Sequence, residues 1–425
     1  MNTDLQVQVE RKIYKDLDAT AVLGANKLKK SLERDFGATI GGLNIPGIYR
    51  LQNSKQSPLV QNILSEKEIN SFYGALSFAW KNKVYLELTG RQDWSSTLPV
   101  DHNSYFYPSA SLSYVFSDDL KISNLSFGKL RLAWAKVGSD GDPYSIYKTY
   151  VGNPNFGNYA NYTVSNTLNK LDLKPEQTES WEAGFDLRFF NDRAGIDLCF
   201  YTCKTLDQII PLATSATTGF TRQFINAGEM SNTGFELVLH GIPIRKTNFS
   251  WELDFQFGKN QNKVVSLVPG DKSIQSLPLA SPGAISIQAQ IGQPYGTIFG
   301  YNYLYDKSGN KLIDPNTGFY LKSNSVMPIG NISPDFTGGI TNSFRWKNFD
   351  FNFFIDFRKG GDIVSFTNAV GIYSGLFEET AQRNYKENEI VYDGIYAVLD
   401  SKGRPILEGG GGTETLTDDY YKSNG

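Results

Sequence analysis

Apolar and polar residues alternate along much of this chain with a period of two. The pattern is clearest in three segments, 180–190, 248–258 and 348–358. Their apolar positions include Trp181, Phe185, Phe189, Trp251, Phe255, Phe351 and Phe353. Polar residues such as Glu182, Asp186, Glu252 and Asp254 stand between them. Because successive side chains of a strand point to opposite faces, each segment is predicted to be a strand with one apolar and one polar face.

The alternation recurs more weakly in other segments, which together number about a dozen and are about 10 residues or longer, the length that a tilted strand needs to cross a bilayer. We therefore predict an all-β fold: a partial transmembrane antiparallel up-and-down β-barrel, with the listed aromatic positions facing lipid. A soluble β-sandwich also alternates and is the competing interpretation. The segments are long for globular strands of about 5–6 residues, and their apolar face is crowded with Phe and Trp, so the barrel is favoured.

The segments are joined by two classes of connection. Short ones stand at Lys81–Lys83, Asn191–Arg193 and Lys347–Asn348, and long ones at Gly37–Lys67, Thr97–Ser104, Gly138–Pro175 and Asp207–Thr221. Outer-membrane barrels have short periplasmic turns and long external loops, so we expect the two classes to lie at opposite rims. The stretch Asn260–Pro334 is the least regular, with a strand-like run, GTIFGYNYLY, among Gly, Pro and Ser residues.

Composition supports this picture. The chain has 425 residues, is 14% aromatic and carries a net charge of −3, which excludes a basic surface for nucleic acid. No apolar run of about 18 residues predicts a transmembrane helix. The start, MNTDLQVQVERKIY, lacks the apolar core of a signal peptide, and the end, TDDYYKSNG, lacks a closing strand. We expect residues 1–425 to be one barrel domain, a fragment of a longer chain.

No catalytic, metal or cofactor site is predicted. Cys199 and Cys203 are too far apart along one strand to form a disulfide. The two histidines, His102 in a loop and His240 on a polar strand face, are not predicted to converge with acids. Asp306 lies in a DKSGNKLIDPNTG stretch that lacks the spacing of a calcium loop, so a solvated turn is favoured over a cation site. Carboxylates that might suggest a glycosidase lie regularly along strand faces, as in a hydrated lumen wall.

Aromatic and amide residues crowd one predicted external loop. We take these as candidate substrate contacts: Tyr144, Tyr147, Tyr150, Asn155, Tyr159 and Tyr162. Flat rings cover the apolar faces of sugars or peptides, and amides bond to hydroxyl or backbone groups. The competing interpretation is that these rings pack the loop on itself and on a partner lid. A second aromatic group, Trp94, Tyr105 and Tyr107, is expected in the interfacial girdle.

Several segments together resemble one family. They are GLNIPGIYRLQNS, LTGRQDWSSTL followed by YFYPSASLSYVF, KLRLAWAKVG, LKPEQTESWEAGFDLRFF, GFTRQFINAGEMSNTGFELVL and IGNISPDFTGGITNSFRW. In this order they resemble the barrel of SusC/RagA-like TonB-dependent outer-membrane receptors of the Bacteroidetes type, with Arg91, Asp93, Ser95 and Pro108 at matching places. The plug domain, the TonB box and the terminal barrel strands of that family are not matched.

The resemblance implies import of a nutrient, an oligosaccharide or a peptide, across the bacterial outer membrane. It also implies two partners: a SusD-like surface lipoprotein as lid, and the TonB–ExbB–ExbD complex acting through the plug. A passive porin or an adhesin barrel without energy coupling is the main alternative, and a soluble carbohydrate-binding sandwich is the third. The family's members are transporters, so no enzyme activity is expected.

Overall fold

The computed structural model describes residues 1–268, 274–281, 285–377, 394–399, 405–407 and 414–415. The contacts between residues divide the chain into two compact units. One consists of Met1–Gln256 and Ile340–Phe354, and the other of the described residues of Phe257–Gly339 and Ile355–Gly425. Among the described residues no helix has both the length and the apolarity to cross a membrane.

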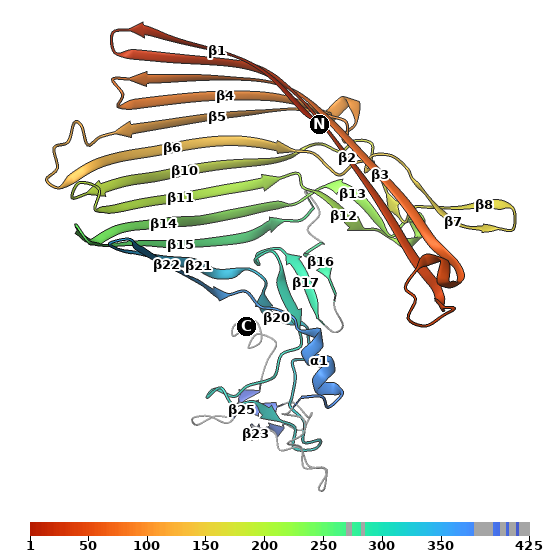
Figure 1. Ribbon diagram of the computed structural model, residues 1–425. Helices are drawn as coiled ribbons and strands as arrows, with labels where there is room; N and C mark the ends of the chain where they lie inside the picture. The colour runs from red at the N-terminus through yellow and green to blue at the C-terminus, as the bar shows by residue number, and fades with distance from the viewer. Residues whose placement is uncertain (269–273, 282–284, 378–393, 400–404, 408–413, 416–425) are drawn as a thin grey trace. The chain divides into compact units, whose positions relative to one another are not determined.

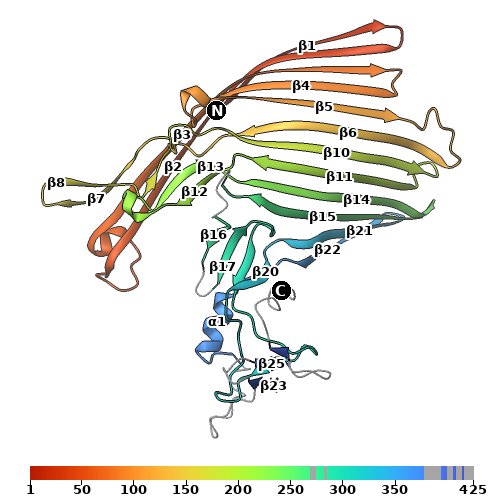
Figure 2. The same cartoon turned by 180° about the vertical axis from the view of Figure 1, so that it is seen from behind.

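A 12-stranded sheet dominates the structure (Figures 1 and 2), so the prediction of about a dozen strands is confirmed. Its strands, in spatial order, are β1 (Asn2–Tyr14), β2 (Leu17–Leu43), β3 (Ser54–Trp80), β4 (Val84–Ser95), β5 (Ser104–Val115), β6 (Leu125–Ser139), β10 (Glu176–Phe189), β11 (Ala194–Leu206), β14 (Glu229–Lys246), β15 (Phe249–Ser266), β21 (Pro334–Trp346) and β22 (Phe349–Gly360). From β1 to β14 each strand pairs antiparallel with the next. This is the up-and-down order that the alternation predicts.

The register between strands keeps the two faces chemically distinct. One row across six strands consists of Leu86, Leu112, Leu132, Ala183, Phe200 and Phe235. The adjacent row, on the other face, consists of Glu87, Ser111, Ala133, Glu182, Tyr201 and Gly234. A shift of one residue in any pairing would exchange the faces of that strand, so the pattern fixes the register. We call these the apolar face and the polar face.

Several neighbouring strands of the sheet are joined by tight turns. The turns Lys81–Lys83 and Lys347–Asn348 fill the gaps between β3 and β4 and between β21 and β22, as predicted, and Phe190–Arg193 joins β10 to β11. Several of these residues, including Lys81, Asn82, Asn191 and Lys347, have a positive φ. Left-handed residues match a tight turn to the twist of the strands that it joins.

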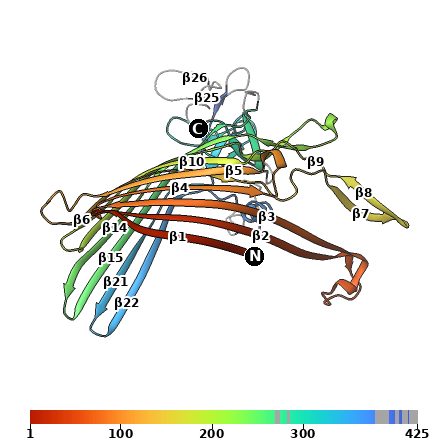
Figure 3. The same cartoon turned by 90° about the horizontal axis from the view of Figure 1, so that it is seen from above.

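The prediction of a loop over Gly37–Lys67 is wrong. β2 and β3 continue as a paired hairpin as far as Leu43 and Ser54, which leaves a short connection that contains the 3-10 helix η1 (Leu51–Asn53). β1 pairs with β2 only to Leu28, and β4 pairs with β3 only to Ile69, so the rest of the hairpin extends as a two-stranded ribbon (Figure 3). Most of the ribbon is exposed, and its alternation of apolar and polar residues is interrupted at Arg34 and by the adjacent apolar pairs Leu59–Val60 and Ile63–Leu64.

Other predicted loops contain small strands. In Gly138–Pro175 these are β7 (Tyr150–Phe156), β8 (Tyr159–Val164) and β9 (Thr167–Leu168), and in Asp207–Thr221 there is β12 (Ile209–Ala213), followed by the 3-10 helix η3 (Ala216–Thr218) and then β13 (Arg222–Asn226). The β7–β8 hairpin projects from the main sheet in all views (Figures 1 to 3). The loop Thr97–Ser104 holds only the 3-10 helix η2 (Val100–His102), as its prediction as a loop requires.

The irregular stretch Asn260–Pro334 contains a second sheet. Its strands are β16 (Ser276–Ala280), β17 (Ser286–Gln290), β18 (Thr297–Gly300) and β20 (Met327–Asn331). The strand-like run GTIFGYNYLY supplies β18, which is buried along its whole length. The compact unit formed by Phe257–Gly339 and Ile355–Gly425 has further described elements. They are β19 (Leu312–Ile313), α1 (Phe366–Tyr373), β23 (Ile395–Tyr396), β24 (Val398–Leu399), β25 (Pro405–Leu407) and β26 (Glu414–Thr415).

Candidate functional site

The polar face of the main sheet is hollowed where β2 to β6, β10 and β11 lie side by side. A cavity of about 550 Å³ is lined there by side chains that include Glu87, Lys129, Arg131 and Glu182. Arg131 on β6 donates to Asp197 on β11, across the intervening strand β10. Charges of both signs with water access are typical of the interior of a large outer-membrane barrel.

A buried polar cluster lies where the long external connection leaves β6. The Asp140 carboxylate accepts hydrogen bonds from Lys67, Ser95 and Thr97, with 3.0 Å to the Thr97 hydroxyl. Only 7% of the Asp140 side chain is exposed. Apolar residues pack nearby in a small core, namely Leu98, Tyr105, Ile146 and Leu173. This Asp140 cluster therefore fixes the first residues of the β6–β10 connection to the ends of β3 and β4.

A second charged group follows it on the same face. Arg91 donates to Asp93 at 2.7 Å and to the Ser71 hydroxyl at 2.7 Å, and the Tyr107 hydroxyl also donates to Asp93. The prediction that Tyr105 and Tyr107 belong to an interfacial aromatic girdle is wrong. Tyr105 and Tyr107 pair with Asp93 and Arg91, on the polar face, and Tyr105 is only 8% exposed. Trp94 lies on the opposite, apolar face and packs edge-on against Phe72.

The candidate substrate contacts fall into two groups. Tyr150, Tyr159 and Tyr162 are 68%, 78% and 65% exposed on the β7–β8 hairpin. Tyr150 and Tyr162 share one face of that hairpin, because Tyr150 pairs with Val164 and Tyr162 with Gly152. The side chain of Asn155 lies outside the described residues. The hairpin thus presents aromatic rings to solvent, which leaves its role as substrate contact a prediction.

Tyr144 and Tyr147 lie closer to the main sheet. The backbone N–H of Glu66 donates to the Tyr144 hydroxyl at 3.1 Å, and the Asn169 side chain donates to the carbonyls of Tyr144 and Tyr147. Tyr144 has a φ of 68°. The Tyr144 hydroxyl thus bonds to its own chain, whereas Tyr147 is bonded through its backbone and remains 57% exposed, so the role of both residues as substrate contacts stays a prediction.

The aromatic positions predicted to face lipid lie on the apolar face or its continuation. Trp181, Phe185, Phe351 and Phe353 are exposed, and Phe189, Trp251 and Phe255 are half-buried. Their rings pair across strands, as in the Trp134–Trp181 contact at 6.1 Å and the stacked Trp251–Phe344 contact at 5.7 Å. So large an exposed apolar surface is unusual for a soluble monomer.

Asp306 closes a turn on itself. Its carboxylate accepts from the backbone N–H groups of Ser308 and Asn310 at 2.9 and 2.7 Å and from the Asn310 side chain at 3.0 Å. The Asn310 side-chain hydrogen bond, together with these amides, lowers the pKa of Asp306. The geometry is that of the solvated turn favoured by the sequence.

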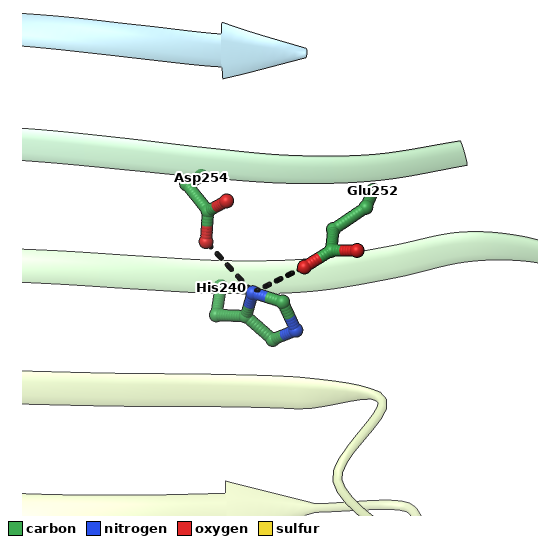
Figure 4. A group of neighbouring side chains, drawn as sticks. All are labelled: His240, Glu252 and Asp254. Atoms are coloured by element: carbon green, nitrogen blue, oxygen red, sulfur yellow. Dashed lines mark hydrogen bonds and ion pairs between the residues drawn. The ribbon is translucent and has the colours of Figure 1, made fainter. Parts of the chain in front are cut away.

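One convergence of side chains was missed from the sequence. His240 on β14 lies beside Glu252 and Asp254 on β15, and both carboxylates point toward the same imidazole nitrogen (Figure 4). The alternation placed each residue on a polar face, but only the pairing of the two strands brings them together. The sequence feature that could have predicted this contact is the tight turn between two strands whose polar positions carry a histidine and two acids.

A large antiparallel sheet with one polar face and one exposed apolar face defines the class of outer-membrane β-barrel proteins. Comparison with known proteins specifies the family. The model of the TonB dependent receptor-like β-barrel family matches residues 13–402. The chain belongs to this family, whose members lie in the bacterial outer membrane, and the predicted likeness to SusC/RagA-type receptors is confirmed.

Individual relatives agree. The chain is 29% identical over 347 residues to TonB-dependent receptor SusC of Bacteroides thetaiotaomicron, covering 74% of this chain and 34% of that protein. It is 28% identical over 351 residues to TonB-dependent receptor P3 of Formosa agariphila, covering 75% and 34%. The fold is similar to the solved RagAB peptide transporter, with a TM-score of 0.69, 19% identity, and 84% of this chain and 40% of that chain covered. The chain thus spans about a third of the length of these curated relatives.

Proposed function

We propose that this chain supplies barrel wall and external loops to a protein that imports a nutrient across the outer membrane by TonB-dependent transport. The observation that carries the proposal is the match of the TonB-dependent receptor barrel family to residues 13–402. In such a barrel the polar face lines the lumen and the apolar face contacts lipid. Trp181, Phe185, Phe189, Trp251, Phe255, Phe351 and Phe353 are the proposed lipid-facing residues.

The proposed cargo is an oligosaccharide or a peptide. The similar fold of the solved RagAB peptide transporter supports a peptide, and an oligosaccharide is what the resemblance to SusC/RagA-like receptors implies. The exposed rings of the β7–β8 hairpin can stack on either class of ligand while the polar loop around them supplies hydrogen bonds. We propose Tyr150, Tyr159 and Tyr162, with Tyr144, Tyr147 and Asn155, as the external contact surface.

Two partners belong to the proposal. A SusD-like surface lipoprotein would cap the external loops and deliver the cargo, and the TonB–ExbB–ExbD complex would act on a plug domain in the lumen. Energy would then come from the inner membrane. No step of covalent chemistry is part of the proposal: carboxylates such as Glu87, Glu182 and Asp186 follow the polar rows of the sheet, as in a hydrated lumen wall.

Uptake by living cells tests the proposal. Cells that carry the complete gene and cells that lack it receive fluorescent oligosaccharides or fluorescent peptides, with and without a protonophore. TonB-dependent import predicts that either the oligosaccharides or the peptides are taken up only by cells that carry the gene, and that this uptake stops when the protonophore is added. Gene-dependent uptake that persists with the protonophore would instead indicate a passive porin, and no gene-dependent uptake of either class would contradict import.

The aromatic surface is tested separately. Tyr150→Ala with Tyr162→Ala removes two rings from one face of the hairpin, and Val151→Ala with Thr163→Ala alters the opposite face as a matched control. Substrate contact predicts slower uptake in the first variant alone, with the lipoprotein still bound on co-purification. Normal uptake in both variants would contradict substrate contact, and loss of the lipoprotein in the first would assign the rings to the lid.

A further inference from the structure

We propose that His240, Glu252 and Asp254 form a binding site for a divalent transition-metal cation, with Zn²⁺ as the best fit, on the polar face of the main sheet. Nothing in the family match predicts such a site, and the inference does not depend on the import proposal. It rests on three donor side chains that two adjacent strands bring together (Figure 4).

The donor atoms are close enough to share one cation. His240 Nδ1 lies 2.7 Å from Asp254 Oδ1 and 3.8 Å from Glu252 Oε1. One ligand atom from each residue lies within 4.8 Å of the other two. Around a tetrahedral Zn²⁺ with bonds of about 2.0–2.2 Å, neighbouring ligand atoms are about 3.3–3.6 Å apart. To reach that geometry, His240 Nδ1 and Asp254 Oδ1 would separate by about 0.7 Å and Glu252 Oε1 would approach Nδ1 by about 0.4 Å.

The backbone holds these donors in place. β14 and β15 are neighbours in the main sheet and are joined by the two-residue turn Thr247–Asn248. Each donor extends from a hydrogen-bonded strand, so little backbone entropy is lost when a cation binds. A third of the His240 and Asp254 side chains is exposed, and half of the Glu252 side chain, so a cation can enter without opening the sheet.

The chemistry of the donors selects the cation. One imidazole nitrogen and two carboxylates suit Zn²⁺ and its neighbours in the transition series, whereas Mg²⁺ and Ca²⁺ prefer oxygen ligands alone. Nδ1 can coordinate when the ring hydrogen is on Nε2, which is one of the two neutral tautomers. In the structure the same nitrogen is instead in contact with the Asp254 carboxylate, which is the arrangement expected without a cation.

The surroundings attract positive charge. Beside His240 the polar face has a hollow of about 320 Å³, and its lining includes three aspartates, Asp186, Asp192 and Asp197, with a single arginine, Arg188. Arg188 already approaches Asp186 at 3.7 Å, and Arg131 pairs with Asp197. The local excess of carboxylates favours a divalent cation over an anion. Three protein ligands also leave a fourth position for water or for a carboxylate of a bound molecule.

Metal binding to the purified full-length protein tests the site. The protein is stripped with a chelator, and Zn²⁺ binding is measured by calorimetry, with Co²⁺ as a second probe read by its visible absorption. The wild type is expected to bind one equivalent that His240→Ala does not bind. Asp254→Asn keeps the size of the side chain and removes its charge, and it should weaken binding by at least about 100-fold, since loss of even an outer-shell partner costs 10–100-fold.

The second histidine of the chain provides the matched control. His102 lies in the 3-10 helix η2, and His102→Ala should bind Zn²⁺ with the same stoichiometry and affinity as the wild type. Folding of each variant is checked by the heat-dependent gel shift of the barrel. If Asp254→Asn is folded and retains the full equivalent and affinity, or if the wild type binds no Zn²⁺, the proposal is overturned.

Discussion

Replacing Asp140 should release the start of the β6–β10 connection from the sheet. The carboxylate is 7% exposed, and its three donors come from β3 and from the end of β4 and the residues just after it. Ser95 and Thr97 are 1% and 2% exposed, so neither can turn to water when its acceptor is removed. In Asp140→Ala the two hydroxyls keep their mutual contact at 3.0 Å, and the Ser95 hydroxyl still accepts from the backbone N–H of Thr97 at 3.3 Å, but both lose the carboxylate acceptor and Lys67 loses its counterion.

The magnitude follows from these burials. Removing one partner of a buried ion pair costs about 3–5 kcal/mol, and a buried hydroxyl without its acceptor costs about 1–3 kcal/mol. The hydroxyls still bond to each other and Lys67 is 20% exposed, so we take about 3 kcal/mol as the expected local loss. That corresponds to about a 150-fold rise in the population of the open connection. Asp140→Asn keeps an acceptor oxygen and should lose about half as much free energy.

Hydrogen exchange in the detergent-purified full-length protein measures this change. Peptides from 138–147 should lose some protection in Asp140→Asn and more in Asp140→Ala. Peptides from β10 and β11 lie outside the cluster and should exchange as in the wild type. A double-mutant cycle with Lys67→Met should show coupling of about 1 kcal/mol or more. Wild-type protection of 138–147 in Asp140→Ala would refute the reasoning.

Three further outcomes follow from the structure. Gly24→Ala places a Cβ 2.2 Å from the Tyr73 ring, whose hydroxyl bonds to Asp4 at 2.7 Å, so chemical unfolding should show a loss of about 1–3 kcal/mol in the free energy of unfolding. In the control Gly241→Ala the added Cβ meets no atom nearer than 4.0 Å, and the free energy of unfolding should hardly change. Phe185→Lys should lower the stability of the barrel in vesicles by about 2–4 kcal/mol and Glu182→Lys by much less; equal losses would contradict the assignment of faces. The lowered pKa of Asp306 means that its carboxylate stabilises the turn above its unfolded pKa, and that this contribution is lost as the pH falls through the lowered folded pKa. The difference in hydrogen exchange of 304–312 between wild type and Asp306→Asn should therefore be present at about pH 6 and shrink toward about pH 3; a difference independent of pH would show that the charge is not responsible.

The strands of the main sheet could be predicted because one face of each is apolar. Segments such as 180–190 carry their alternation in the sequence itself, and a two-residue turn such as Lys347–Asn348 is bounded by two such segments. The far part of the β2–β3 hairpin has a less regular pattern, because adjacent residues such as Leu59 and Val60 are both apolar and both exposed. Its hydrogen-bond ladder extends to Leu43 and Ser54, and a ladder leaves no mark in the hydrophobic pattern.

The sites could be predicted only in part, because their partners are remote in sequence. Asp140 lies 73 residues from Lys67 and 45 from Ser95, and no local pattern joins them. Tyr105 was assigned to the wrong environment because aromatic rings at a strand end suit both a membrane interface and a packed loop core, and the register with Asp93 decides between them. His240 and Asp254 needed the pairing of β14 with β15 before their contact could be recognised.

Spin labels in the full-length protein, reconstituted in a bilayer, test the two-faced sheet most directly. Labels that replace Phe185, Phe255 and Phe353 should be relaxed by oxygen, which concentrates in acyl chains. Labels that replace Glu182 and Asn352 should be relaxed by a water-soluble nickel chelate. Two-residue alternation between these responses is the predicted result. Labels at the three phenylalanine positions that respond to neither agent, as in a dry protein interior, would contradict the outer-membrane barrel and with it the proposed transport.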